Sequence, residues 1–499
     1  MVCYSDHFLK ETAVSSDAKP REVRFPTLIS YGLGDMFGGG SFTVIGLLFM
    51  FFLTEFVGLA PFLAGLVFAV GKGFDAISDP LMGYISDRTK SRFGRRRIYF
   101  LIGIAPIAVS FAALWVPLTV GPQWARAIYY AVAYVFFSAV FTMVMVPYSA
   151  LNAELTRDYR MRTRLSGARL VFSQFSTLLA GTLPGLIVDL APGADATGYL
   201  MMGSAFGIFY ALPWILVFLG TWELPDYVPP ATQTVRKYFR EFIRIFRNKS
   251  FRIHISMYIA AYSAVDILMA VFAYFITYYL ERPNLYSLAI GSLLVAQIAM
   301  LPVYVRIANA RGKGFAYRLG MALWGSGLIL VFFVVQPGSP AWLLSAVCVL
   351  MGAGLSAGIL IPWAMLPTIT DVDELITGQQ RAGTYSGAMT LFRKLVQGLI
   401  AIPLVGLVLQ LIGFVSNQPQ SPETIQGLRI FFVFGPVVII ALGILAAAAF
   451  PIMPHTHEII RGEIERLRNG GRKEDVDEKT RDVCETVTGL PYGELYSST

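Results

Sequence analysis

Three ionisable residues lie close together in an otherwise apolar stretch of the chain. Lys72, Asp75 and Asp79 occur in the sequence GKGFDAISDP, and steps of three and four residues place them on one face of a helix. Two carboxylates one turn apart repel each other when both are ionised, and a bound small cation or proton relieves that repulsion. The pattern therefore favours a cation site with hard oxygen ligands, suited to Na⁺ or H⁺. The alternative is a structural ion-pair cluster in which Lys72 fixes helix packing.

Further polar residues interrupt other apolar stretches and are candidates for the same site. They are Asp35, Thr142, Asp266, Arg393 and Lys394. Ionisable residues inside a membrane span are costly and usually functional. A lysine near the middle of a span, such as Lys394, needs an acidic partner, which Asp75 or Asp79 could supply. For Thr142 and Arg393, a packing role is an equally good interpretation.

The composition indicates what surrounds these residues. Of 499 residues, 55% are hydrophobic and only 14% are charged, whereas a soluble domain carries about 25% charged residues. Mean hydropathy is +0.60. The net charge of +8 could suggest nucleic acid as a partner. Lysine and arginine, however, cluster in short segments between apolar runs, which is typical of cytoplasmic loops. We therefore expect an integral membrane protein that contacts the lipid bilayer and does not bind nucleic acid.

Twelve segments are long and apolar enough to span a bilayer, which takes about 20 residues each. They are 27–56, 60–86, 98–118, 126–152, 166–189, 200–222, 251–281, 286–307, 316–336, 341–366, 384–413 and 427–453. We expect helices, because an open sheet would leave backbone groups unpaired in lipid. The expected fold is an all-α membrane protein with twelve transmembrane helices in two six-helix bundles.

The loops set the expected orientation. The loop DRTKSRFGRRR contains six basic residues, whereas VGLAP, DLAPGADATG and VQPGSP contain no lysine or arginine. Because basic loops remain in the cytoplasm, we expect both termini there, in a plasma (inner) membrane protein.

The chain divides into five expected parts. These are a cytoplasmic N-terminal tail (1–25), a first bundle (26–222), a cytoplasmic linker (223–250), a second bundle (251–453) and a cytoplasmic C-terminal tail (454–499). In the linker, Val235, Tyr238, Phe239, Phe242 and Phe246 recur at helical spacing between basic residues, which predicts an amphipathic helix on the cytoplasmic leaflet. The alternative is a linker with only some helicity. In the tail we expect helix around 458–468.

Six spans, a cytoplasmic linker and six more spans are the layout of transporters whose halves rock about a central site. The exit from the second span carries a more specific pattern. In GYISDRTKSRFGRRR, glycines that permit tight turns accompany an acid and several arginines that can pair at a helix end. The residues of this loop motif are Gly83, Asp87, Arg88, Gly94, Arg95 and Arg96.

This loop sequence resembles the loop motif of the major facilitator superfamily. The longer stretch FDAISDPLMGYISDRTKSRFGRRR is similar to that of the glycoside–pentoside–hexuronide:cation symporters, the family of melibiose permease. Three further segments share the similarity: SYGLGDMFGGG, VPYSALNAELTRDYRMRTRL and TDVDELITGQQRAGTYSGAMTLFRKL. These signatures lie in both halves of the chain.

The resemblance implies roles for individual residues. Asp75 and Asp79 match the family's paired cation-site carboxylates, and Thr142 matches a hydroxyl that lines that site. Lys394 matches the lysine that pairs with those carboxylates. Arg169 matches, with a gap of one residue, an arginine near the sugar. We expect Asp35, Lys72 and Asp266 to serve substrate binding or coupling as well.

Two departures from the family pattern concern the sugar. Gly39 and Met145 stand where melibiose permease has acidic residues, and Ser149 stands in place of an aromatic residue. A galactoside held by two carboxylates is therefore not expected. A pocket with Arg169 and Lys394 would suit a hexuronide. It would equally suit a phosphate-bearing amphiphile, since the family's relatives include sodium-dependent lysophospholipid symporters.

Four functions remain open from the sequence. We expect a secondary active symporter of a glycoside, pentoside or hexuronide, driven by Na⁺ or H⁺ through alternating access. The alternatives are a lysophospholipid symporter or flippase, a membrane-embedded enzyme, and a sensor that binds without transport. No catalytic triad, metal-ligand cluster or phosphate loop supports an enzyme, and we interpret His254 as an interfacial residue. We expect no cofactor other than the coupling cation, which would be bound by Asp75 and Asp79 if it is Na⁺, and we expect a monomer.

Overall fold

The computed structural model describes residues 22–156, 158–191, 196–223, 243–416 and 418–496, and no β-strand occurs within these ranges. The first half contains α1 (Phe25–Leu33), α2 (Asp35–Val44), α3 (Pro61–Arg88), α4 (Arg97–Ala113), α5 (Gln123–Leu155), α6 (Tyr159–Asp189), α7 (Ala196–Ala211) and α8 (Pro213–Gly220). The second half contains α10 (Lys249–Tyr274), α11 (Tyr286–Arg311), α12 (Lys313–Val334), α13 (Ala341–Thr377), α14 (Ala382–Val396), α15 (Ile402–Leu411) and α16 (Pro422–Ala448). The tail contains α17 (Pro454–Arg468) and α18 (Glu478–Thr488).

The expected twelve spans and all-α fold are confirmed. Eleven helical stretches of the described chain are long and apolar enough to cross a membrane, and α4 is a shorter apolar helix of 17 residues. The sequence predicted that the third span would extend to residue 118, whereas α4 ends at Ala113. The aromatic residues of the predicted linker helix, apart from Phe246, lie outside the described residues.

Several spans consist of more than one helical piece. In the first span, α1 ends before Gly34, α2 follows, and two π-helical turns (Ile45–Phe49 and Phe52–Phe56) complete it. The eleventh span likewise contains a π-helical turn, Gln397–Ala401, between α14 and α15. π-helical turns are rare and frequently occur at functional sites. These two interruptions lie in helices that carry charged candidate residues.

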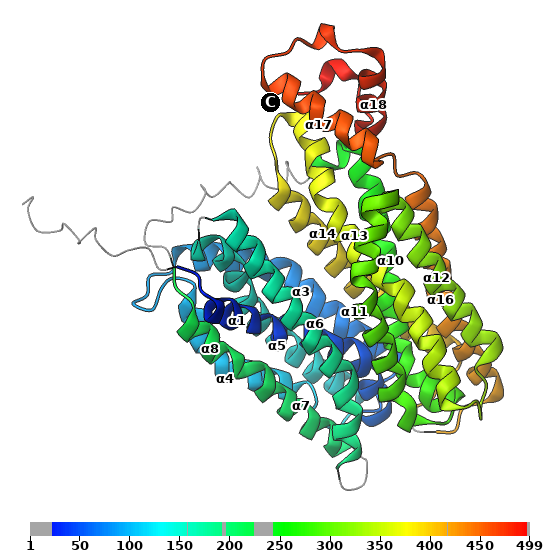
Figure 1. The fold of residues 1–499 in the computed structure, drawn as a ribbon. Helices are drawn as coiled ribbons and strands as arrows, with labels where there is room; N and C mark the ends of the chain where they lie inside the picture. The colour runs from blue at the N-terminus through cyan, green and yellow to red at the C-terminus, as the bar shows by residue number, and fades with distance from the viewer. Residues whose placement is uncertain (1–21, 157, 192–195, 224–242, 417, 497–499) are drawn as a thin grey trace, which may run out of the picture.

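The two halves form separate bundles that meet near one set of loops (Figure 1). Thr54 and Tyr274, which end the first and seventh spans, share a hydrogen bond of 2.6 Å between their hydroxyls. The next turn adds a hydrogen bond from Tyr278 to Glu55. The halves are therefore joined here by direct side-chain contacts.

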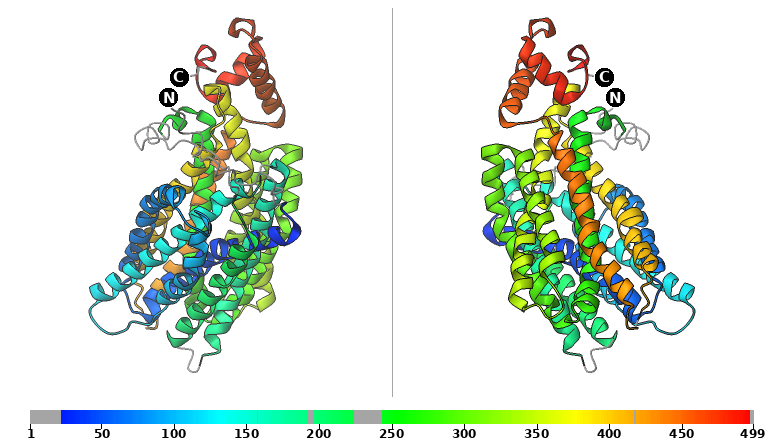
Figure 2. Two further views of the ribbon diagram at one scale, coloured as in Figure 1. Left: turned by 90° about the vertical axis from the view of Figure 1, so that its left-hand side faces the viewer. Right: turned by 90° about the vertical axis from the view of Figure 1, so that its right-hand side faces the viewer.

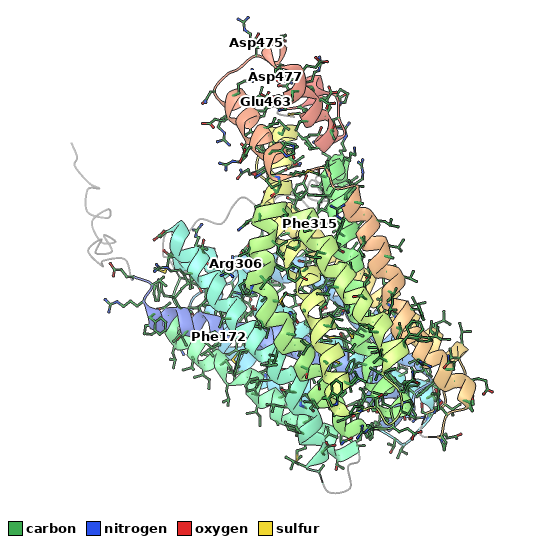
Figure 3. The ribbon with its side chains drawn as sticks, turned by 45° about the vertical axis from the view of Figure 1, so that its right-hand side comes forward. Phe172, Arg306, Phe315, Glu463, Asp475 and Asp477 are labelled. Atoms are coloured by element: carbon green, nitrogen blue, oxygen red, sulfur yellow. The ribbon has the colours of Figure 1, made fainter. Side chains whose placement is uncertain are left out.

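The C-terminal tail forms a small helical unit at the other end of the second half (Figure 2). The helix expected around 458–468 is confirmed as α17, which begins at Pro454. The Ser250 hydroxyl donates to the Val487 carbonyl at 2.6 Å, and the Tyr496 amide donates to the Leu375 carbonyl at 2.8 Å. Figure 3 labels Glu463 in this unit, where it pairs with Arg466. The tail is thus docked on α10 and α13.

Candidate functional site: two carboxylates and a lysine from the opposite half

The polar residues of α3 contact a lysine from the opposite half of the molecule. Lys394 of α14 places its Nζ 2.5 Å from Asp79 Oδ2 and 3.8 Å from Asp75 Oδ2. Lys72 Nζ lies 3.6 Å from the same Asp75 oxygen. Two positive and two negative side chains thus form one cluster, and Lys394 contributes the contact that links the halves. The expected pairing of Lys394 with both carboxylates is present.

Asp75 is the least solvated acid of the cluster. Its side chain has 0% exposure, and neither of its oxygens has a hydrogen-bond partner among the described residues. A buried carboxylate without hydrogen bonds is costly, since desolvation disfavours its charge. The two lysines at 3.6 and 3.8 Å compensate the charge without satisfying the oxygen lone pairs. The lone pairs of Asp75 therefore remain available to a cation.

The second acid has a different environment. Thr142 of α5 donates a hydrogen bond of 2.8 Å to Asp79 Oδ1, and the Ser78 hydroxyl lies 3.3 Å from that of Thr142. Pro80 follows Asp79 and lacks an N–H, so the carbonyl one turn earlier loses its usual intrahelical donor. Hydroxyl, carboxylate and free carbonyl oxygens are the ligands that hard cations prefer. These groups supply oxygen ligands beside Asp75.

The aromatic surroundings hold Lys72 in place. Its ammonium lies 3.6 Å from the centre of the Phe42 ring, a geometry that favours a cation. Its side chain also packs against Gly398 of the eleventh span, where an added Cβ would lie 2.2 Å from the Lys72 Cβ. The absence of a side chain at Gly398 therefore allows α3 and the eleventh span to approach closely.

The remaining candidates form two separate ion pairs rather than joining the cluster directly. In the first half, Arg169 of α6 donates to Asp35 of α2 at 3.0 Å. In the second half, Arg393 of α14 lies 3.6 Å from Asp266 of α10. Gln397 also donates to Asp266, at 2.9 Å. The sequence singled out four of these residues as charged interruptions or by resemblance, but gave no reason to notice Gln397.

A family model described as MFS/sugar transport protein matches residues 30–453 of this chain. The chain belongs to this family. The expected major facilitator membership is therefore confirmed, and the chain is an integral membrane transporter of the symporter type rather than an enzyme.

Curated relatives match almost the whole chain. An uncharacterized symporter of Synechocystis is 29% identical and covers 91% of this chain and 98% of the relative. A glucuronide carrier protein homolog of Escherichia coli is 23% identical, with coverages of 90% and 97%. A sphingosine-1-phosphate transporter of Xenopus tropicalis is 24% identical, with coverages of 88% and 90%.

Solved structures support the same fold. A D-xylose-proton symporter superposes with a TM-score of 0.62 at 16% identity, over 85% of this chain and 97% of that chain. Identity this low establishes the fold and leaves the site to be argued from its residues.

Gly39 and Met145, which stand in place of the two acids of the melibiose permease pattern, both make packing contacts in the first half. A Cβ added at Gly39 would lie 2.2 Å from the Ser173 hydroxyl and 2.9 Å from its carbonyl oxygen. Gly39 therefore serves close packing of α2 on α6. Met145 is buried in the core of the first half.

The loop motif forms a compact ion cluster at the end of α3. Arg96 donates to Asp87 at 2.7 Å and to Glu154 at 2.5 Å, and Arg95 lies 2.9 Å from the same Glu154 oxygen. Gly94 adopts φ of +102°, a conformation that favours glycine. The motif therefore ties the ends of α3 and α5 together.

Two acidic residues of this cluster were not predicted from the sequence. Glu154 lies inside the segment VPYSALNAELTRDYRMRTRL, which resembles the family, and Glu223 lies three residues after the end of α8. Glu223 accepts the backbone N–H groups of residues 95, 96 and 97 at 2.9–3.0 Å, at the N-terminus of α4. Arg88 stacks on Tyr84, its guanidinium 3.4 Å from the ring centre.

The interpretation of His254 as interfacial was wrong. Its side chain is fully buried, and its Nε2 lies 2.7 Å from the Pro362 carbonyl oxygen.

Proposed function

We propose that this chain is a secondary active transporter that couples a sugar-type solute to Na⁺ or H⁺ by alternating access. The observation that supports the coupling most strongly is the environment of Asp75. Its charge is fully buried, its oxygens accept no hydrogen bond among the described residues, and its nearest cation from the opposite half is Lys394. A site of this kind is stabilised by binding a cation and is sensitive to the relative position of the halves.

In this proposal, Lys394 and the coupling cation compete for the same carboxylates. Without the cation, Lys394 neutralises Asp79 and links α14 to α3. A bound cation neutralises the carboxylates in place of Lys394. Repulsion between the bound cation and the Lys394 ammonium then favours release of the lysine. A sodium ion would use the oxygens of Asp75, Asp79 and Thr142, because hard cations prefer carboxylate and hydroxyl ligands. A proton would need only one carboxylate.

We further propose that both termini are cytoplasmic and that the protein lies in the plasma (inner) membrane. The contacts between Thr54 and Tyr274 would then close the extracellular end. Asp35, Arg169, Asp266 and Lys72 would lie along the solute path, and their exchange of partners would couple the solute to the halves. The similarity to a sphingosine-1-phosphate transporter supports a second candidate, a lysophospholipid, at the same site.

Transport by purified protein in proteoliposomes tests this function. We expect labelled sugars or uronides to accumulate inside the vesicles when an inward Na⁺ or H⁺ gradient is imposed, and the accumulation to vanish when an ionophore dissipates it. Labelled lysophospholipid in the same assay separates the second candidate. Uptake of neither class, under either gradient, would contradict the proposed function.

Cysteine labelling tests the orientation. The labelling uses a Cys3→Ser background, because the chain has three cysteines and only Cys348 and Cys484 are buried in the described structure. We expect Lys90→Cys, in the basic loop, to react with an impermeant maleimide only after cells are permeabilised. Gly121→Cys, in the loop between α4 and α5, should react in intact cells. The reverse pattern would place the termini outside.

A further inference from the structure

The two Arg–Asp pairs occupy corresponding places in the two halves. Arg169 lies ten residues after the start of α6, the fifth span of the first half. Arg393 lies eleven residues after the start of α14, which begins the fifth span of the second half. Each arginine faces an aspartate on the first span of its own half, Asp35 or Asp266. The same pairing therefore recurs on the same helices of the two repeats.

The two pairs differ in how tightly the acid holds the arginine. Arg169 and Asp35 lie 3.0 Å apart, which is hydrogen-bond distance. Arg393 and Asp266 lie 3.6 Å apart, which is beyond it. The Asp266 oxygen that faces Arg393 already accepts a hydrogen bond from Gln397. Arg393 thus compensates the charge of Asp266 from beyond normal hydrogen-bond distance, while Asp266 accepts its close hydrogen bond from Gln397.

Arg393 is nevertheless held in a defined position. Its guanidinium lies 4.0 Å from the centre of the Tyr262 ring, and Trp363 donates to the Tyr262 hydroxyl at 3.0 Å. The Arg393 side chain keeps 32% exposure, whereas Asp266 keeps 8%. A charge this exposed in the interior of a span is too costly to face lipid. Its exposed part is therefore expected to face polar groups rather than lipid.

We propose that Arg393 binds an acidic group of the transported solute. An arginine stacked on an aromatic ring presents its N–H groups edge-on, and the planar fork matches the oxygens of a carboxylate, sulfonate or phosphate. The acidic group of the solute accepts hydrogen bonds from the Arg393 N–H groups that Asp266 does not engage at close range. Asp266 meanwhile keeps its hydrogen bond from Gln397. This inference rests on the proposed function and assigns the chemical class of its substrate.

The position of Arg393 also links this acid to the coupling cation. The next residue, Lys394, contacts Asp79 and Asp75, and one turn further Gln397 contacts Asp266. One turn of the eleventh span therefore carries both the anion-binding arginine and the lysine that contacts the cation-binding acids. An anionic solute at Arg393 and a cation at Asp75 attract each other, so each favours binding of the other. The solute and the cation are thus carried as a neutralised pair.

Binding of matched acid and neutral compounds to the purified transporter tests the proposal. The probes are aryl β-glucuronide and aryl β-glucoside, 6-sulfonated and ordinary 6-deoxyglucose, and lysophosphatidate and monoacylglycerol. We expect wild-type protein to bind the acid of at least one pair about 10- to 100-fold more tightly than its neutral match, as for a charge-assisted hydrogen bond. Arg393→Gln should remove this preference by weakening the acid alone. Arg393→Lys should retain part of it, since the charge remains and the fork is lost.

The outcomes separate this proposal from the proposed function. Wild-type protein without acid preference in all three pairs, or Arg393→Gln with the preference intact, would overturn the role of Arg393. Equal weakening of acid and neutral compounds by Arg393→Gln would likewise overturn it, because that pattern indicates a structural role. Gradient-driven uptake without acid preference would leave the proposed function standing. Acid-selective binding without gradient-driven uptake would do the reverse.

Discussion

Asp75→Asn and Asp79→Asn are each expected to abolish cation-driven accumulation of the solute. Each substitution keeps the side-chain shape and removes one of the two negative charges that compensate the loss of water around a bound cation. Removing one charge of a buried pair in a binding site costs about 3 kcal/mol, which corresponds to roughly 100-fold weaker cation binding. The effect of Asp75→Asn should be the larger, because Asp75 is fully buried. Initial rates of gradient-driven uptake in proteoliposomes measure both effects.

Lys394→Gln is the matched control from the opposite half. It removes the lysine that competes for Asp79, so cation affinity should be retained or should rise. Reorientation of the empty carrier should slow instead, because Asp79 loses the lysine that compensates its charge, whereas Asp75 keeps Lys72. A purely structural ion-pair cluster gives another pattern. All three variants would then lose expression together, and any folded remainder would keep full cation dependence.

Glu154→Ala is expected to destabilise the folded transporter by about 3–5 kcal/mol, because it breaks a buried ion pair and leaves a buried charge uncompensated. Glu154 has 1% side-chain exposure and contacts both Arg95 and Arg96. Denaturation of the purified protein with increasing SDS in mixed micelles measures the change in the free energy of unfolding.

Asp87→Asn is the control for this prediction. Asp87 pairs with the same Arg96 but keeps 27% exposure, so its loss should cost only about 1 kcal/mol. Equal effects of the two substitutions would show that burial does not govern the cluster. Destabilisation by Asp87→Asn without destabilisation by Glu154→Ala would contradict the prediction that Glu154 contributes more to the free energy of unfolding than Asp87.

Much of the fold follows from the sequence because lipid leaves few alternatives. Apolar runs of about 20 residues must be helices, and α3, α5 and α10 begin within a few residues of their expected starts. The helix breaks within spans were not predicted. The π-helical turn at Gln397–Ala401 packs against α3 through Gly398, and no local pattern in the sequence encodes that contact.

The site was predictable in composition and less so in its connections. Charges in apolar runs are rare enough to stand out, so Asp75, Asp79 and Lys394 could be named before their contacts were known. The pairing of Arg169 with Asp35 was not predicted, because neither charge pattern nor resemblance linked these two residues to each other. Glu154 and Glu223 lie at span ends, where acids are common and a buried one has no distinguishing pattern.

The central claim is that Asp75 and Asp79 hold a cation whose binding is coupled to that of the solute. Calorimetric titration of the purified transporter, with solute at several Na⁺ concentrations and pH values, tests it most directly. Linkage requires that the cation tighten solute binding by the same factor by which the solute tightens cation binding. We expect the cation to tighten solute binding in the wild-type protein, and we expect this tightening to disappear in Asp75→Asn. Solute affinity independent of both Na⁺ and pH in the wild type, or unchanged dependence in Asp75→Asn, would contradict the claim.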